Sequence, residues 1–242
     1  MTVSKYARDP IAEAAVYVSY EPLDDQRIER LRVVLASGEV AGFAQPTPLL
    51  EIAIESRFGD ETGSSARQRV GGYAVVSQDG RQRVQVRRDA CVYSVLRPYP
   101  GWEQFAAEAA RWFDLLQYRE LSLTAIGTRY INHLELPDSE PVERYLRTYP
   151  ELSHDLPQVV YNQYARFELP YPDEQSGVLT IQEGYVRVQD GQEAVDRFLL
   201  DLDLRLNAKP GEALSSLLPK IHDDKNRAFE ACITEEMRNL IR

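Results

Sequence analysis

The sequence has few histidines, few cysteines and no long apolar run. Three histidines and two cysteines in 242 residues give little material for nucleophilic or metal-dependent catalysis, and we find no nucleophile-elbow serine and no phosphate-binding loop. The apolar runs stay below the roughly 20 residues of a membrane helix, and the N-terminal MTVSKYARDP lacks the apolar run of a signal peptide. We therefore expect a cytoplasmic protein without membrane association, cofactor or metal, and we favour a non-enzymatic role.

The chain also lacks a concentrated positive charge. Its net charge is −10, with the acidic residues spread along the chain, which disfavours nucleic acid as a partner because phosphate recognition uses a basic surface. A local basic cluster, Arg81–Arg88, is explained as well by a solvated hairpin edge that charge protects against pairing. Cys91 and Cys232 lie far apart in the sequence, so we expect both to be buried free thiols.

The first half of the chain alternates apolar strands with two amphipathic helices. The Asp79-Gly80 pair predicts a hairpin turn, and the polar segment Arg57–Gln68 predicts an exposed loop. The expected elements are a strand Ile11–Tyr20, a helix Gln26–Ser37, strands Leu49–Glu55, Gly72–Ser77 and Arg81–Leu96, and a helix Trp102–Glu120.

The same order of elements returns in the second half. The expected elements are a strand Ser122–Leu136, a short helix Val142–Tyr149, strands Val159–Leu169, Gly177–Val188 and Val195–Leu206, and a helical region Gly211–Ile241 that Pro219 breaks or kinks near its beginning. The order predicts an α+β fold of two similar β-α-β-β-β-α halves, residues 1–120 and 121–242. We expect curved antiparallel sheets, or one continuous sheet, with the long helices on one face.

Several strands carry polar residues on one face that are candidates for a binding site. Asp201 and Asp203 stand side by side on the strand Val195–Leu206, at a spacing that suits either a divalent cation or pairing with arginines of neighbouring strands. Arg129 and His133 share one face of their strand and suggest either an anion site or ordinary ion pairs.

Three other segments stand out. Glu13 lies inside the apolar first strand, where a buried carboxylate needs a partner such as an arginine. His222 begins a polar cluster that is either a helix start or part of a site. The segment Tyr93–Phe105 is rich in aromatic residues and proline, and packing at a strand-to-helix corner explains it more simply than an aromatic binding platform.

The ordered motifs resemble an uncharacterised, sporadically distributed family of prokaryotic proteins. The resemblance rests on Pro10-Ile11-Ala12-Glu13-Ala14, on the central set Asp89, Tyr93, Ser94, Leu96, Pro98, Tyr99 and Trp102, on Arg129-Tyr130-Ile131-Asn132 with Pro137, on Leu200, Asp201 and Asp203, and on His222, Phe229 and Thr234. It covers nearly the whole chain and implies an accessory or defence-linked role. It marks Glu13, Asp89, Arg129, Asn132, Asp203 and His222 as positions to follow and assigns no role to any of them.

Two functions are compatible with these features. The first is a non-enzymatic binding or regulatory module that acts through protein contacts or self-association, favoured by strand faces rich in tyrosine, arginine and carboxylates. The alternative is a protein, enzymatic or not, that binds a small molecule or nucleotide in a pocket between the sheet and the long helices. Arg129, His133, Asp201, Asp203 and His222 would line that pocket.

Overall fold

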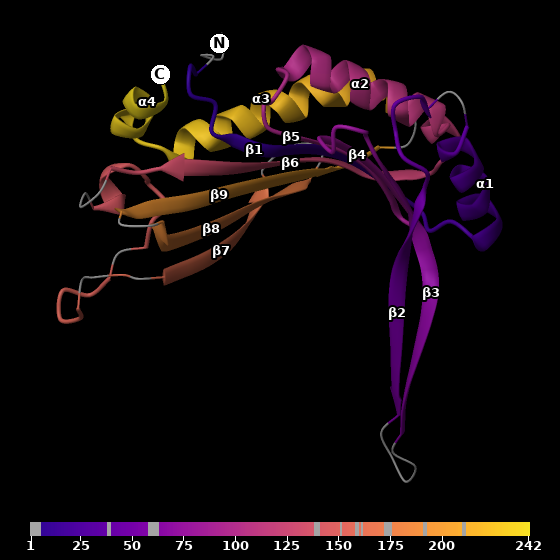
Figure 1. Cartoon of the computed structure of the whole chain (residues 1–242), viewed down its shortest axis with the longest axis horizontal. Coiled ribbons are helices and arrows are strands. Elements are labelled where there is room, and N and C mark those ends of the chain that lie inside the picture. Colours follow the sequence, from indigo (N-terminus) through magenta and orange to yellow (C-terminus); the bar gives the residue numbers. More distant parts are fainter. Residues whose placement is uncertain are drawn as a thin grey trace.

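The structure is a computed structural model, and it describes residues 6–37, 40–57, 63–137, 141–150, 152–157, 160, 162–171, 176–190, 193–209 and 212–242. Over these residues nine strands form one antiparallel sheet, with helices packed against it (Figure 1). The strands are β1 Ile11–Tyr20, β2 Thr47–Arg57, β3 Gly63–Val76, β4 Gln82–Arg87, β5 Ala90–Leu96, β6 Leu123–Glu135, β7 Asn162–Tyr171, β8 Gly177–Asp190 and β9 Glu193–Asn207. The helices are α1 Asp25–Leu35, α2 Trp102–Leu115, α3 Leu214–Cys232 and α4 Glu235–Ile241, with 3-10 turns at Tyr118–Glu120 and Val142–Arg144. The predicted α+β class with an antiparallel sheet is confirmed.

The first strand of the chain lies in the middle of the sheet. The strand order is β2-β3-β4-β5-β1-β6-β9-β8-β7, so β1 pairs with β5 on one side and with β6 on the other, where Tyr17 stands opposite Gly127. This pairing joins the two halves of the chain in a single sheet. Figure 1 shows α2 and α3 over one face of the sheet and the β2–β3 hairpin extending away from it.

Apolar side chains from alternating strand positions build the core beneath the helices. From residue 198 to residue 206 of β9 the even-numbered apolar side chains are buried (Phe198, Leu200, Leu202, Leu204 and Leu206), as the period of two along a strand requires. The helix α2 buries Phe105, Ala109, Trp112 and Phe113 in the same hydrophobic core, which is the stripe that its spacing predicts. None of the helices that the structure describes is long and apolar enough to cross a membrane.

Two sequence expectations differ from the structure in the first half. The expected strand Arg81–Leu96 is two strands, β4 and β5, because the chain turns between them and the backbone of Asp89 accepts a hydrogen bond from Tyr20 N instead. Part of the expected loop Arg57–Gln68 belongs to β3, which pairs with β2 from Gly63 onward, because a hairpin that extends into solvent needs no apolar face. The first half therefore has the order β-α-β-β-β-β-α, with one strand more than predicted.

The helices of the second half also differ from expectation. The predicted helix Val142–Tyr149 is only the 3-10 turn. The C-terminal helical region is two helices, because Ile233 is extended and bridges to Leu146, and Thr234 then caps α4 by accepting a hydrogen bond from Met237 N. Pro219 lies inside α3, which continues through it. The first residue of the predicted strand Val159–Leu169 falls outside the described residues.

Candidate functional site

A cavity of about 330 Å³ lies where the start of α2 meets the middle of α3 above β6. Tyr130 and Asn132 of β6 are almost completely buried and form its floor. The rest of its lining includes Trp102 and Glu103 of α2 and His222, Lys225, Asn226 and Phe229 of α3. We call this cavity the α2–α3 pocket; its volume lies in the range of small-molecule sites.

Lys225 is the one cation buried inside the pocket lining. The apolar stripe of α3 passes through Ile221 and Phe229, and Lys225 lies four residues from each, so the helical period turns its side chain inward. Only 6% of the residue is exposed. Its Nζ lies 3.6 Å from the centroid of the Tyr130 ring, which is the geometry of a cation–π contact.

The Lys225 amine has no carboxylate partner among the residues that the structure describes. The neighbouring Lys220 shows the contrast, because its Nζ lies 2.8 Å from Asp224 Oδ2. Burial lowers the pKa of Lys225 to about 7, and the negative charge of Asp9 opposes this shift only in part. Near neutral pH the side chain is therefore divided between ammonium and free amine, and the free amine is a nucleophile.

His222 stacks flat on Trp102 at the other wall of the pocket. The ring centroids are 4.0 Å apart and the planes differ by 11°. Its Nε2 lies 3.0 Å from Asn226 Nδ2, within hydrogen-bond distance. Burial, with a further contribution from the Lys225 charge, lowers the pKa of His222 to about 4. The imidazole is therefore neutral at pH 7.

Two tyrosine hydroxyl groups and an amide complete the floor. The hydroxyl groups of Tyr99 and Tyr130 lie 3.0 Å apart, within hydrogen-bond distance. Burial raises the pKa of both phenols well above the ordinary range, so both stay protonated. The Asn132 amide is held by the backbone, because its Nδ2 donates to the carbonyl oxygens of Tyr130 and Leu200 at 3.2 and 3.0 Å. The floor is thus a rigid, uncharged surface around the Lys225 amine.

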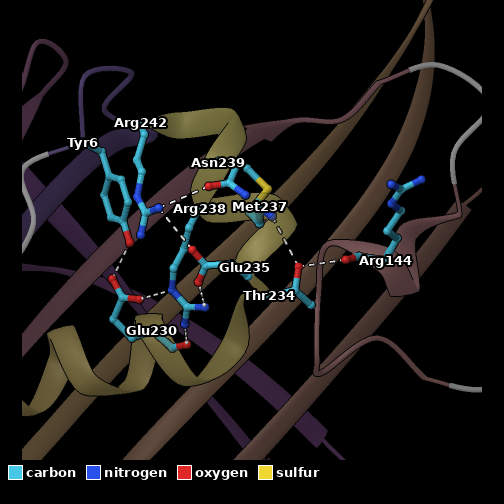
Figure 2. Close-up of polar contacts among 9 residues, drawn as sticks. All are labelled: Tyr6, Arg144, Glu230, Thr234, Glu235, Met237, Arg238, Asn239 and Arg242. Carbon is cyan, nitrogen blue, oxygen red and sulfur yellow. Dashed lines mark hydrogen bonds and ion pairs between the residues drawn. The ribbon is translucent and has the colours of Figure 1, made fainter.

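Acidic groups lie at the rim of the pocket and not at its floor. Asp9 and Glu103 are exposed, and Glu230 is partly buried. Figure 2 shows how Glu230 is held: its Oε1 accepts from the Tyr6 hydroxyl at 2.5 Å, and its Oε2 accepts from Arg238 Nε at 2.6 Å. This network ties the N-terminal segment to α3 and fixes one wall. The pocket therefore combines an uncharged floor around the Lys225 amine with aromatic walls and an acidic rim.

The start of α2 adds a second source of positive potential. Gly101 caps the helix with φ +92°, and no side chain accepts a hydrogen bond from the first turn. The backbone N–H groups of an uncapped first turn favour an electronegative atom nearby. Gly101 and Lys225 both border the pocket, so both favour a ligand with an acceptor oxygen.

The polar residues of the opposite sheet face form a separate network. Arg129 makes a bidentate contact with Asp201, with Nη2–Oδ2 and Nε–Oδ1 distances of 2.6 and 2.9 Å, and Gln182 Nε2 donates to the same carboxylate at 3.1 Å. Asp203 accepts a hydrogen bond from the Tyr17 hydroxyl at 2.8 Å. Each carboxylate thus has protein partners, and among the described residues no cluster of His, Cys, Asp and Glu could hold a metal ion.

The sequence candidates therefore do not converge on one site. Asn132 and His222 line the α2–α3 pocket, whereas Arg129, Asp201 and Asp203 belong to the opposite face. Three further candidates also lie elsewhere: Glu13 is on the Arg129 face and adds its charge there, His133 is exposed on β6, and Asp89 is exposed in the turn between β4 and β5.

Sequence reasoning missed Lys225, Tyr130 and the role of Trp102. A signal for Lys225 was present, because it interrupts the apolar stripe of α3 and is one of only four lysines beside 24 arginines. Arginine is not deprotonated in proteins, so a buried lysine in an arginine-rich chain is chemically distinct. The stacking of Trp102 on His222 joins residues 120 positions apart and has no sequence signal.

A second hollow of about 590 Å³ lies on the other side of α2, toward β4 and β5. Its cations are paired within the hollow: Arg81 lies 2.9 Å from Asp79, and Arg111 lies 2.5 Å from Glu108. This hollow is larger, but its charges are already neutralised by neighbours. The α2–α3 pocket is therefore the stronger candidate.

Comparison with known protein families finds no match for the chain, and comparison with curated proteins finds none either. The family resemblance of the sequence motifs assigns no role to the pocket. Its function is therefore inferred from its geometry.

Proposed function

We propose that the chain binds a small, flat organic molecule in the α2–α3 pocket. The observation that carries this proposal is the Lys225 amine, which is buried, faces a cavity and has no carboxylate partner among the described residues. Burying a cation without a partner costs free energy, and a ligand oxygen that accepts a hydrogen bond from Nζ would offset that cost.

The remaining lining indicates the other parts of the ligand. Trp102, Tyr99 and Phe229 border the cavity and suit a planar apolar body. Asp9 and Glu103 at the rim suit hydroxyl or amine groups at the far end. The best fit is a molecule with a carbonyl or carboxylate head on Lys225, a flat body, and hydrogen-bond donors at the opening.

Calorimetry and thermal unfolding with 2-naphthamide and 2-naphthoate test this proposal. Both probes present an acceptor oxygen on a flat body, and a ligand at 100 times its Kd stabilises the folded state by about 2.7 kcal/mol. We expect at least one probe to raise the melting temperature of the wild-type protein and to have a much smaller effect on Lys225→Met. Lys220→Met is the matched control and should behave like the wild type. Equal stabilisation of all three proteins, or of none, would contradict the proposal.

A second candidate function is self-association through a sheet edge, favoured by exposed apolar side chains on the two edge strands. Ile52 on β2 is 67% exposed, and on β7 Tyr164 and Leu169 are 66% and 45% exposed. An open edge strand with apolar side chains is a template for pairing with another chain. Light scattering after size exclusion should show a dimer that Leu169→Lys converts to a monomer, whereas Leu156→Lys, in a loop, leaves it unchanged. A strictly monomeric wild type would refute this function.

We also propose that the two halves of the chain are equivalent by duplication. Outward from the β1–β6 pair, the order β1-β5-β4-β3 corresponds to β6-β9-β8-β7, and a long helix follows β5 and β9. β2 has no counterpart. Superposing β6, β9 and β8 on β1, β5 and β4 tests this, because equivalence requires α3 to fall on α2.

A further inference from the structure

We propose that Lys225 captures an aldehyde or ketone in the α2–α3 pocket as an imine. This inference rests on the proposed function and names the ligand class: a carbonyl compound with a flat aromatic or conjugated body. It makes Lys225 the reactive group of the pocket as well as its hydrogen-bond donor.

Three features of the pocket support a nucleophilic amine. Lys225 lines the cavity, and its Nζ lies over the face of the Tyr130 ring, 3.6 Å from the ring centroid. Its helix neighbour Asp224, itself buried, is engaged by Lys220 and Arg227 and so is not available to hold the Lys225 charge. Desolvation of a lysine in an apolar pocket is the usual way in which proteins activate it as a nucleophile.

The balance of protonation points the same way. Burial lowers the pKa of Lys225 to about 7, so a large fraction is free amine near neutral pH, whereas an ordinary lysine is only about 0.1% amine at pH 7.4. The reaction should therefore select Lys225 over the other lysines of the chain, Lys5, Lys209 and Lys220.

The chemical step needs no additional reactant. The Nζ lone pair attacks the carbonyl carbon, the C=O π electrons move to oxygen, and a proton passes from nitrogen to that oxygen to give a carbinolamine. The hydroxyl group then leaves as water together with the second proton of the nitrogen, and the nitrogen lone pair forms the C=N bond. Tyr99 and Tyr130, whose hydroxyl groups lie 3.0 Å apart, line the same pocket as Lys225, and a phenol that donates a hydrogen bond to the departing oxygen would assist this step.

Reductive trapping of the full chain tests the inference. The protein is incubated with 2-naphthaldehyde at pH 7.4, the imine is reduced with sodium cyanoborohydride, and the adduct is located by peptide mass spectrometry. Among the lysine side chains we expect one adduct, at Lys225, formed about tenfold faster or more than at any other lysine; peptide mapping separates it from labelling of the α-amino group. The variant Lys225→Arg should lose it, and Lys220→Arg should keep it. Because mapping of the wild type locates the adduct directly, the test holds even if a variant fails to fold.

The amide 2-naphthamide separates the two proposals, because it has the same flat body but a carbonyl carbon that does not form an imine. If 2-naphthamide binds the wild type while the aldehyde labels all four lysines at similar rates or labels none, the imine inference is overturned and the binding function stands. If neither 2-naphthamide nor 2-naphthoate binds and no Lys225 adduct forms, both proposals fall. A selective Lys225 adduct that excess 2-naphthamide suppresses supports both.

Discussion

Replacing Lys225 by methionine should stabilise the protein most at neutral pH and progressively less at alkaline pH. Burial lowers the folded-state pKa of the amine from 10.5 to about 7, so the unfolded chain binds the proton more tightly. Above pH 10.5 the amine is neutral in both the folded and the unfolded state, so its burial does not change the free energy of unfolding. As the pH falls from 10.5 toward 7, the unfolded state takes up the proton first and the folded state loses stability. Linkage gives a cost of about 4 kcal/mol at pH 7, about 2 kcal/mol at pH 9 and below about 0.5 kcal/mol at pH 10.5.

Methionine removes this cost while preserving most of the side-chain volume. The cation–π contact with Tyr130 contributes about 1–2 kcal/mol in a desolvated setting, and this contribution is lost with the charge. The net gain for Lys225→Met should therefore be about 2–3 kcal/mol at pH 7. The dependence of this gain on pH is the more specific expectation, because improved packing alone would give a gain that does not change with pH.

Urea unfolding followed by circular dichroism at pH 6, 7, 8 and 9 measures the effect. The difference in unfolding free energy between Lys225→Met and the wild type should fall by about 2 kcal/mol between pH 7 and pH 9. Lys220→Met is the control, because its side chain is 35% exposed and paired with Asp224, and its difference should stay nearly constant over this range. A flat difference for Lys225→Met, or a loss of stability at pH 7, would refute the reasoning that the amine is desolvated and unpaired.

Three further substitutions test other parts of the fold. Glu183 is fully buried and burial raises its pKa, so the wild type loses stability as the pH rises above about 4.5. In urea unfolding, the free energy of unfolding of Glu183→Gln should therefore rise relative to that of the wild type between pH 4 and pH 7, and a difference that does not change with pH would contradict this. Asp201→Ala should lower the unfolding free energy by about 2–3 kcal/mol, because it leaves Arg129, half-exposed, without its partner; a loss below about 0.5 kcal/mol would argue against the pair. Gly127→Ala should lower the unfolding free energy by about 1–3 kcal/mol, since the added Cβ would lie 1.9 Å from Tyr17 Cζ. Because Tyr17→Ala removes the clashing ring, it should cost less stability in the Gly127→Ala background than alone. Strict additivity of the two substitutions would exclude the clash.

The fold was predictable where strand alternation or helical spacing decides burial. The alternation in β9 and the apolar stripe of α2 correctly predict which apolar side chains are buried, although Asp201 on the other face of β9 is buried as well. The prediction failed at β3, because a two-stranded hairpin in solvent carries no apolar pattern. It also failed at the turn between β4 and β5, where Arg88 donates to the carbonyl oxygens of Leu23 and Val70 and so stabilises a turn that has no glycine or proline.

The candidate site was only partly predictable, because sequence motifs do not tell which face of the sheet a residue occupies relative to the helices. Asn132 and Arg129 come from one motif, but alternation sends them to opposite faces, so only Asn132 reaches the pocket. His222 was a candidate, yet its partner Trp102 lies in a distant segment. Lys225 could have been found from the sequence, because it interrupts the apolar stripe of α3. Its lack of a carboxylate partner depends on how α3 packs on β6, which requires the structure.

The central place of β1 has a consequence for how the protein assembles. Tyr17 pairs with Gly127, 110 residues later in the chain, so this hydrogen-bonding edge of β1 stays open during synthesis until β6 has emerged. Such long-range pairing slows folding and exposes strand edges on the way. Residues 1–120 alone would present that open edge permanently, next to the buried apolar face of β1. We therefore expect this fragment to aggregate, and addition of residues 121–242 during refolding to suppress that aggregation by supplying β6.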